Sequence, residues 1–329
     1  MKFLWPVLCL LITWNPACAE DPLRINGETM GSYYSIVIDS PGSTDGERLQ
    51  KDIEEIFAEI NRQMSNWSKD SEITRFNESR STDWFPVGKQ FAIVTQEAKR
   101  LHTVTGGKLD VTVAPLIELW GFGRNKVKRV PTEEQLKAAM KSVGMQHIEV
   151  RMDPPAIQKL KPEININLAA LAPGFAADEV SKLLCERGLK AHVVDVGGEN
   201  LAGEAKSSGD PWRLGVESPL GGLHKVVEVT NKAIATSGDY RNFFVIDGRR
   251  YSHVLDPSTG KPVENPPASV SVIHKSCMTA DALGTAMMVL GPEEGLKLAK
   301  SLNVDVLFLD VTKEGRLEER STGVFSETE

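Results

Sequence analysis

The stretch from residue 235 to residue 263 constrains the fold most strongly. It contains two turns rich in Ser, Thr, Gly and Asp, separated by an apolar run and by Asp247-Gly248. Asp-Gly between two extended runs is a strong signal for a β-hairpin. The hairpin would carry His253 and the second turn, residues 256–260, back beside the first turn. The sequence therefore predicts that an imidazole, carboxylates, hydroxyls and glycine amides converge at one place.

The remaining pattern predicts an α+β fold, because helical and extended segments come partly in blocks. Apolar residues at helical spacing and helix-start signals such as Thr44 and Thr132 predict the helices. The extended segments include a run of strands from 212 to 273. We expect helices at about 46–64, 88–104, 132–144, 174–188, 279–290 and 292–302, and shorter extended pieces at 33–39, 109–113, 164–166, 191–196 and 304–309.

The N-terminus is typical of a secretory signal. Lys2 gives the positive end, residues 3–14 an apolar core, and Ala17-Cys18-Ala19 a small-residue exit. We expect cleavage after Ala19 and a single domain from 20 to 329, located in the periplasm. Cys18 supports a second interpretation, in which the chain is a lipoprotein tethered to the inner membrane, although Asn15 and Pro16 are not typical of a lipidation site.

Charge and cysteine content exclude some classes of protein. The net charge of −7 argues against a nucleic-acid partner, because phosphate binding needs a basic face. Cys185 and Cys277 are far apart in the sequence, with no Cys/His metal spacing. Two buried thiols are the favoured interpretation, and a disulfide between them is the alternative in an oxidising compartment.

Two candidate sites follow from spacing alone. Asp281 and Thr285 are four apart on an expected helix, so both face one side, and their oxygens suit Mg²⁺ with a phosphate-bearing ligand. An ordinary helix start is the alternative interpretation. His253 could act as a general base or could be a structural residue. The sequence has no GxGxxG after the first strand, no Walker loop and no HExxH motif.

Nine segments in order along the chain resemble the ApbE family of FAD:protein FMN transferases. Each segment alone means little, but the ordered set is highly specific and covers nearly the whole mature chain. The segments are residues 27–31, 64–67, 71–77, 107–116, 119–123, 167–178, 195–198, 235–263 and 280–282.

The resemblance implies a reaction and a set of roles. The family moves FMN from FAD onto a Thr or Ser hydroxyl of an acceptor flavoprotein, with Mg²⁺, and releases AMP. The expected acceptors are flavoprotein subunits of membrane redox complexes. His253 is implied as the base. The other implied residues are FAD-binding Met30, Trp67, Lys108, Leu109, Asp110, Asn167, Pro173 and Leu255, and the metal ligands Ala170 (by its main-chain oxygen), Asp281 and Thr285.

The chain departs from the family pattern at three positions. Many relatives have Asp at the position of Asn167 and Lys at that of Pro173, and some have a second carboxylate where Gly284 stands. These changes concern FAD affinity more than the fold. Two other functions stay open: an FAD pyrophosphatase, with water replacing the acceptor hydroxyl, and a non-catalytic periplasmic FAD-binding protein, which the changes at Asn167 and Pro173 would allow.

Overall fold

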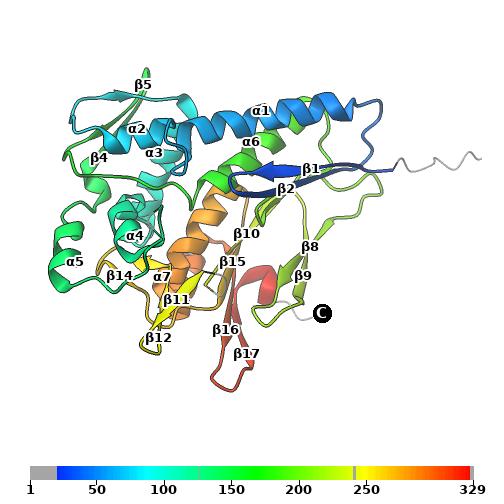
Figure 1. The fold of residues 1–329 in the computed structure, drawn as a ribbon. Coiled ribbons are helices and arrows are strands. Elements are labelled where there is room, and N and C mark those ends of the chain that lie inside the picture. The colour runs from blue at the N-terminus through cyan, green and yellow to red at the C-terminus, as the bar shows by residue number, and fades with distance from the viewer. Residues whose placement is uncertain (1–20, 125, 240–241, 327–329) are drawn as a thin grey trace, which may run out of the picture.

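An eight-stranded antiparallel sheet forms the centre of the molecule (Figure 1). The structure is a computed structural model that describes residues 21–124, 126–239 and 242–326. The strand order is β1-β2-β6-β7-β10-β15-β16-β17. These strands are β1 (Leu23–Thr29), β2 (Ser32–Ile38), β6 (His192–Val196), β7 (Glu199–Ala202), β10 (Lys232–Gly238), β15 (Ser269–His274), β16 (Asp305–Val311) and β17 (Leu317–Ser321).

Helices α6 and α7 pack against the sheet and form the main core with it (Figure 1). Ile36, Val194 and Val272 of the sheet share one apolar cluster with Phe175 of α6 and Met287 of α7. Helix α1 packs in turn on α6. The helices are α1 (Gly46–Met64), α2 (Glu72–Glu78), α3 (Lys89–Val104), α6 (Ala172–Glu186) and α7 (Cys277–Leu302).

A second apolar cluster joins the sheet to the β8–β9 ribbon and the 3₁₀ turn η3. Ile234 and Leu307 of the sheet pack there with Trp212, Val227 and Phe325. The sheet therefore contributes side chains to two cores, which explains why both faces of β15 and β16 are largely buried. The covering elements are β8 (Trp212–Glu217), β9 (Leu223–Val229) and η3 (Gly323–Ser326).

The predicted hairpin is present, and it is placed away from the large sheet. Asp247 and Gly248 both have positive φ, 51° and 73°, as a two-residue type I′ turn requires. Phe244 of the hairpin packs with Trp120 and Leu136 in a third apolar cluster. The elements around it are α4 (Ala114–Trp120), α5 (Glu133–Met140), β11 (Phe243–Ile246), β12 (Arg249–Ser252), β13 (Leu255–Asp256) and β14 (Lys261–Pro262).

A small three-stranded sheet and two 3₁₀ turns complete the fold. These elements, like β1, α2, β7 and β17, were not predicted. They are β3 (Phe85–Pro86), β4 (Ile148–Met152), β5 (Pro155–Lys159), η1 (Val111–Val113) and η2 (Met145–His147).

The structure corrects two of the expected extended segments. Residues 111–113 form η1, because the Asp110 side chain accepts from the amide of Thr112 and caps a turn. The buried segment 164–166 pairs with no strand. Side-chain amides replace a strand partner there, since Asn77 accepts from the Ile166 amide at 2.9 Å and donates to its carbonyl at 2.9 Å.

Helix boundaries also differ locally from expectation. Asp45, not Thr44, caps α1, and the Thr44 hydroxyl donates instead to the carbonyl of Pro41. The two helices expected at 279–290 and 292–302 are confirmed: α7 is interrupted at Gly291, whose φ of 73° is not helical, just before Pro292, although the first part begins at Cys277. The expected helix of residues 132–144 ends at Met140.

The structure also shows the state of the two cysteines outside the signal-like segment. Cys277 is buried and Cys185 is exposed, and both are free thiols, so the disulfide hypothesis is wrong and only one of the two thiols is buried. No helix within the described residues is both long and apolar enough to cross a membrane. The expected signal, residues 1–19 with Cys18, lies outside the described residues.

Candidate active site

The starts of α6 and α7 are held together by close backbone contact. A Cβ on Gly174 would lie 2.5 Å from the carbonyl oxygen of Cys277, so only glycine fits at this contact. The Asp178 carboxylate accepts from the amides of Cys277 and Met278, at 2.8 and 3.1 Å. The Gly174 amide donates to Asp281 Oδ2 at 3.3 Å. The first turn of α6 therefore fixes where α7 presents Asp281.

A cavity of about 350 Å³ opens beside this junction. Asp281 and Thr285 line it one turn apart on α7, and Thr285 Oγ1 lies 3.5 Å from Ser237 Oγ on β10. Glu199 lines the same cavity and accepts from the amide of Thr236 at 3.3 Å. Burial raises the pKa of Asp281 to about 7. Burial, followed by the nearby Asp281 carboxylate, raises the pKa of Glu199 well above its usual range.

The donors around this cavity fit a hard divalent cation. Asp281 and Thr285 offer a carboxylate and a hydroxyl, and Ala170 lies beside them. Among the described residues no cationic side chain pairs with the buried carboxylates to offset their desolvation. Within the described ranges no three His, Cys, Asp or Glu side chains gather closely enough to hold a metal by themselves. A cation here would thus take further oxygens from a carbonyl and from a ligand such as a phosphate.

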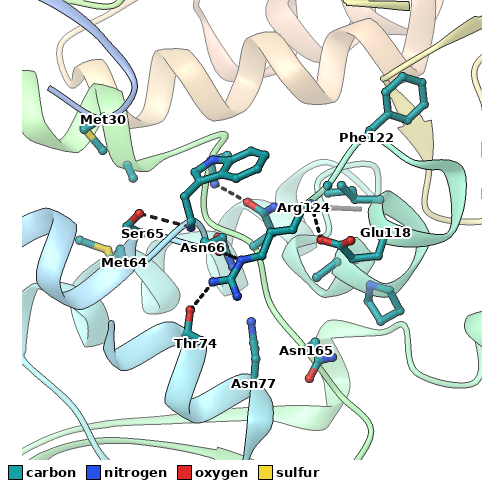
Figure 2. Close-up of a pocket in the computed structure, with 18 of the residues that line it drawn as sticks. Met30, Met64, Ser65, Asn66, Thr74, Asn77, Glu118, Phe122, Arg124 and Asn165 are labelled. Carbon is teal, nitrogen blue, oxygen red and sulfur yellow. Dashed lines mark hydrogen bonds between the residues drawn. The ribbon is translucent and has the colours of Figure 1, made fainter. Parts of the chain in front are cut away.

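A larger cavity of about 660 Å³ adjoins the first. Figure 2 shows Met30 and Met64 at one side of it, Phe122 at another, and the amides of Asn66, Asn77 and Asn165 around it. Trp67 also lines it and is 63% exposed, so Trp67 is not buried against the first helix. Thioethers, aromatic rings and several amides are a lining that suits a planar, hydrogen-bonding ring system.

Arg124 closes one side of the larger cavity (Figure 2). Its guanidinium donates to the main-chain carbonyls of Asn66 and Ser68 and to the Thr74 hydroxyl at 2.8 Å. It therefore ties the segment after α4 to the loop that carries Trp67.

His253 lies where the two cavities meet. It lines both, together with Ile117, Asn167 and Ala169. Its Nδ1 is 2.9 Å from the carbonyl of Asn242 and 3.8 Å from Oδ1 of Asp239. A proton on Nδ1 directed at these acceptors leaves Nε2 as the hydrogen-bond acceptor of the neutral ring.

The structure brings all the sequence-predicted site residues to these two cavities. Met30, Trp67 and Pro173 line the larger cavity, and Asn167 and His253 line both. The smaller cavity is lined by Lys108, Leu109, Asp110, Ala170, Leu255, Asp281 and Thr285.

Lys108, Asp110 and Asn167 also have partners within the protein. Lys108 Nζ pairs with Asp256 at 3.1 Å. The Asp110 side chain is used to cap η1. Asn167 Oδ1 accepts from the amide of Ala169 at 2.9 Å, a turn contact that an Asp would make equally well. The departure at 167 therefore preserves the turn and changes the rest of the side chain from carboxylate to amide.

Sequence reasoning missed Glu199, Arg124 and three asparagines of the larger cavity, Asn66, Asn77 and Asn165. Glu199 had a signal, since it follows Gly197-Gly198 directly after a buried strand. No sequence pattern indicated Arg124, because the carbonyls that it contacts belong to residues more than fifty positions away.

The fold and site define an α+β protein built for an elongated ligand, with a ring pocket at one end and hard oxygen donors at the other. The model of the ApbE family matches residues 30–308. The chain belongs to the ApbE family.

Named relatives agree with this assignment. The chain is 40% identical over 307 residues to the FAD:protein FMN transferase of Vibrio cholerae, covering 92% of this chain and 91% of that protein. It is 33% identical to that of Escherichia coli K12, covering 90% and 86%. The solved flavin transferase ApbE from Vibrio cholerae matches with a TM-score of 0.84 and 39% identity, covering 93% and 98%. The apo flavinyl transferase ApbE of Pseudomonas stutzeri matches with a TM-score of 0.85 and 35% identity, covering 93% and 96%.

Proposed function

We propose that this protein transfers FMN from FAD to a Ser or Thr hydroxyl of an acceptor flavoprotein, with Mg²⁺, and releases AMP. The observation that carries the proposal is the meeting of the two cavities at His253. FAD has a ring system at each end and a pyrophosphate between them, which matches an elongated site with ring-binding and oxygen-donor regions. The names of the relatives support the same activity.

Each part of the site has a role in this reaction. The acceptor hydroxyl oxygen attacks the FMN-side phosphorus while His253 Nε2 takes its proton. The bond from that phosphorus to the bridging oxygen breaks, and AMP leaves with the electron pair. Asp281, Thr285 and the Ala170 carbonyl would hold Mg²⁺, which when bound offsets the charge of the pyrophosphate and the leaving AMP. Holding the acceptor hydroxyl in position to attack the phosphorus supplies much of the remaining rate acceleration.

The compartment and partners form part of the proposal. The signal-like residues 1–19 support export to the periplasm, and Cys18 supports tethering to the inner membrane as a lipoprotein. Acceptors would then be flavoprotein subunits of membrane redox complexes that face the periplasm. Labelling with radioactive palmitate, compared between the wild type and Cys18→Ser, tests the tether: label that is equal in both contradicts it.

Incubation of the purified protein with FAD, Mg²⁺ and a candidate acceptor subunit tests the reaction. We expect flavin fluorescence on the acceptor band in a denaturing gel. AMP formation without an acceptor would favour the pyrophosphatase, and bound FAD without turnover would favour a binding protein.

A further inference from the structure

A basic segment follows α4 in a chain whose net charge is negative. The six residues 124–129 include four cationic ones, Arg124, Lys126, Lys128 and Arg129, whereas the net charge of the whole chain is −7. Lys126, Lys128 and Arg129 are exposed. Lys128 Nζ donates to the Phe243 carbonyl at 3.4 Å, and Arg129 Nε to the Leu119 carbonyl at 3.4 Å. These contacts are to neutral carbonyls, so they do not neutralise the positive charge.

This segment and the β11–β12 hairpin form one surface. Lys128 Nζ lies 5.7 Å from the ring centroid of Phe244 and 6.0 Å from that of Phe122. A Cβ on Gly121 would lie 2.4 Å from the carbonyl oxygen of Val127, so the segment folds back tightly onto the end of α4. Its position beside β11 is thus fixed by packing.

Apolar side chains are exposed among these charges. Val127 is 62% exposed and Val130 46%. We call Lys126, Val127, Lys128, Arg129 and Val130, which lie beside β11, the basic rim. Exposed apolar groups bordered by charges of one sign are typical of a protein-binding surface.

The basic rim continues directly into the site. Phe122 packs with Phe244 behind the rim at 5.2 Å between centroids, and its ring centroid is 6.3 Å from that of His253. Phe122 and His253 also line the larger cavity. A hydroxyl that reaches His253 along this side therefore brings its neighbouring residues onto the rim.

We propose that an extended segment of the acceptor protein, with Asp or Glu beside its target Ser or Thr and an apolar residue among them, docks on the basic rim. This inference rests on the proposed function. Charge complementarity selects the occupant, because Lys126, Lys128 and Arg129 attract carboxylates and repel a basic segment. Of the acidic side chains nearby, Glu118 accepts from the Arg124 amide, Glu133 is paired with Lys261 and Glu264 with Arg249. Glu134 lies in the first turn of α5 and Asp247 at the hairpin turn.

Fluorescence anisotropy with three labelled peptides tests this docking in the presence of FAD. Each peptide has one central Thr and one Val, and the peptides differ only in whether Asp, Asn or Lys flanks the Thr. We expect the Asp peptide to bind about five- to tenfold more tightly than the Asn peptide, and the Lys peptide to bind most weakly. The preference should shrink at high salt.

The double variant Lys126→Glu/Arg129→Glu should lose the preference for the Asp peptide while binding FAD as the wild type does. Lys51→Glu/Lys182→Glu is the matched control, with exposed changes on α1 and α6 away from the hairpin (Figure 1). It should retain the preference. Equal binding of the three peptides by the wild type, or a preference retained by the rim variant, would overturn the proposal. Selective peptide binding without flavin transfer to any acceptor would contradict the proposed function instead, and leave the rim as a binding surface.

Discussion

At the scale of single residues, a buried network supports the base. The Asp239 carboxylate is 1% exposed and accepts from Ser252 and Arg250. Burial raises the pKa of Asp239, but hydrogen bonds from His253 and Ser252 and the charge of Arg250 outweigh burial and hold it below its usual value. A carboxylate therefore stays ionised 3.8 Å from the Nδ1 side of His253. This network orients the ring so that Nε2 can serve the reaction.

Replacement of His253 by Gln should slow flavin transfer by about 10²- to 10⁴-fold, the usual contribution of a general base. FAD binding should change little, because His253 lies at the junction of the cavities and its proposed role is to take a proton. Rates measured with saturating FAD and acceptor, together with FAD affinity by equilibrium dialysis, check this. A variant with the wild-type rate would exclude His253 as the base.

Lys159 is a buried cation outside the site. It is 1% exposed, donates to the carbonyls of Asn77 and Ile164, and its Nζ lies 4.9 Å from the Phe76 ring centroid. Burial, followed by the charge of Arg80, lowers the pKa of Lys159 to about 8 from its ordinary 10.5. The folded state thus binds fewer protons than the unfolded state between pH 8 and 10.5.

The Lys159 contribution to the free energy of unfolding should therefore rise with pH across this window, by up to about 3 kcal/mol. Urea denaturation of the wild type and of Lys159→Met at pH 7, 8, 9 and 10 measures it. The wild type should gain stability relative to the variant as the pH rises. A difference that does not vary with pH would contradict the shifted pKa.

Residue-level prediction was accurate where chemistry coincides with a motif. His253, Asp281 and Thr285 could be named because residue type and spacing suggested their chemistry and the family pattern then supported it. Arg124 could not, because its partners are distant main-chain carbonyls. For Glu199 the Gly197-Gly198 turn before it was a signal, but its burial beside Asp281 was not predictable. No local pattern predicts a buried lysine such as Lys159, since sequence statistics place lysine at the surface.

At the scale of elements, the α6–α7 junction determines the geometry of the smaller cavity. Gly174 permits backbone contact, and Asp178 holds the first amides of α7. The hairpin was predictable because Asp-Gly is a local signal. The pairing of extended segments was harder to predict. Residues 164–166 have the sequence of a strand, but Asn77, which is far away in the sequence, supplies their hydrogen bonds.

Gly174→Ala should destabilise the protein by about 1–3 kcal/mol, because its Cβ meets main-chain atoms that have no free room to move. Flavin transfer should also fall, since the Gly174 amide donates to Asp281. Urea denaturation and transfer rates measure the two effects.

Gly46→Ala is the matched control, since Gly46 is also in the first turn of a helix and its Cβ would meet only the Leu23 side chain, at 3.2 Å. Equal stability of the two variants would contradict the proposed role of the α6–α7 contact.

At the scale of the whole molecule, the large sheet and the hairpin region meet around one elongated site. β7 and β10 contribute Glu199 and Ser237, α7 contributes Asp281 and Thr285, and the segment after β12 contributes His253. The α+β class was predictable from the order of the elements. The strand order was not, because β1 and β6 flank β2 although they are far apart in the sequence, and only tertiary packing decides this pairing.

The proposed reaction joins FMN to protein and releases AMP in equal amounts. Mass spectrometry of the acceptor, with AMP quantified in the same reaction, measures both products directly. We predict an acceptor mass increase equal to one FMN less one water, one AMP per modified acceptor, and loss of both products with Asp281→Asn or with a chelator. AMP without an acceptor adduct, or transfer that Asp281→Asn leaves unchanged, would contradict the account.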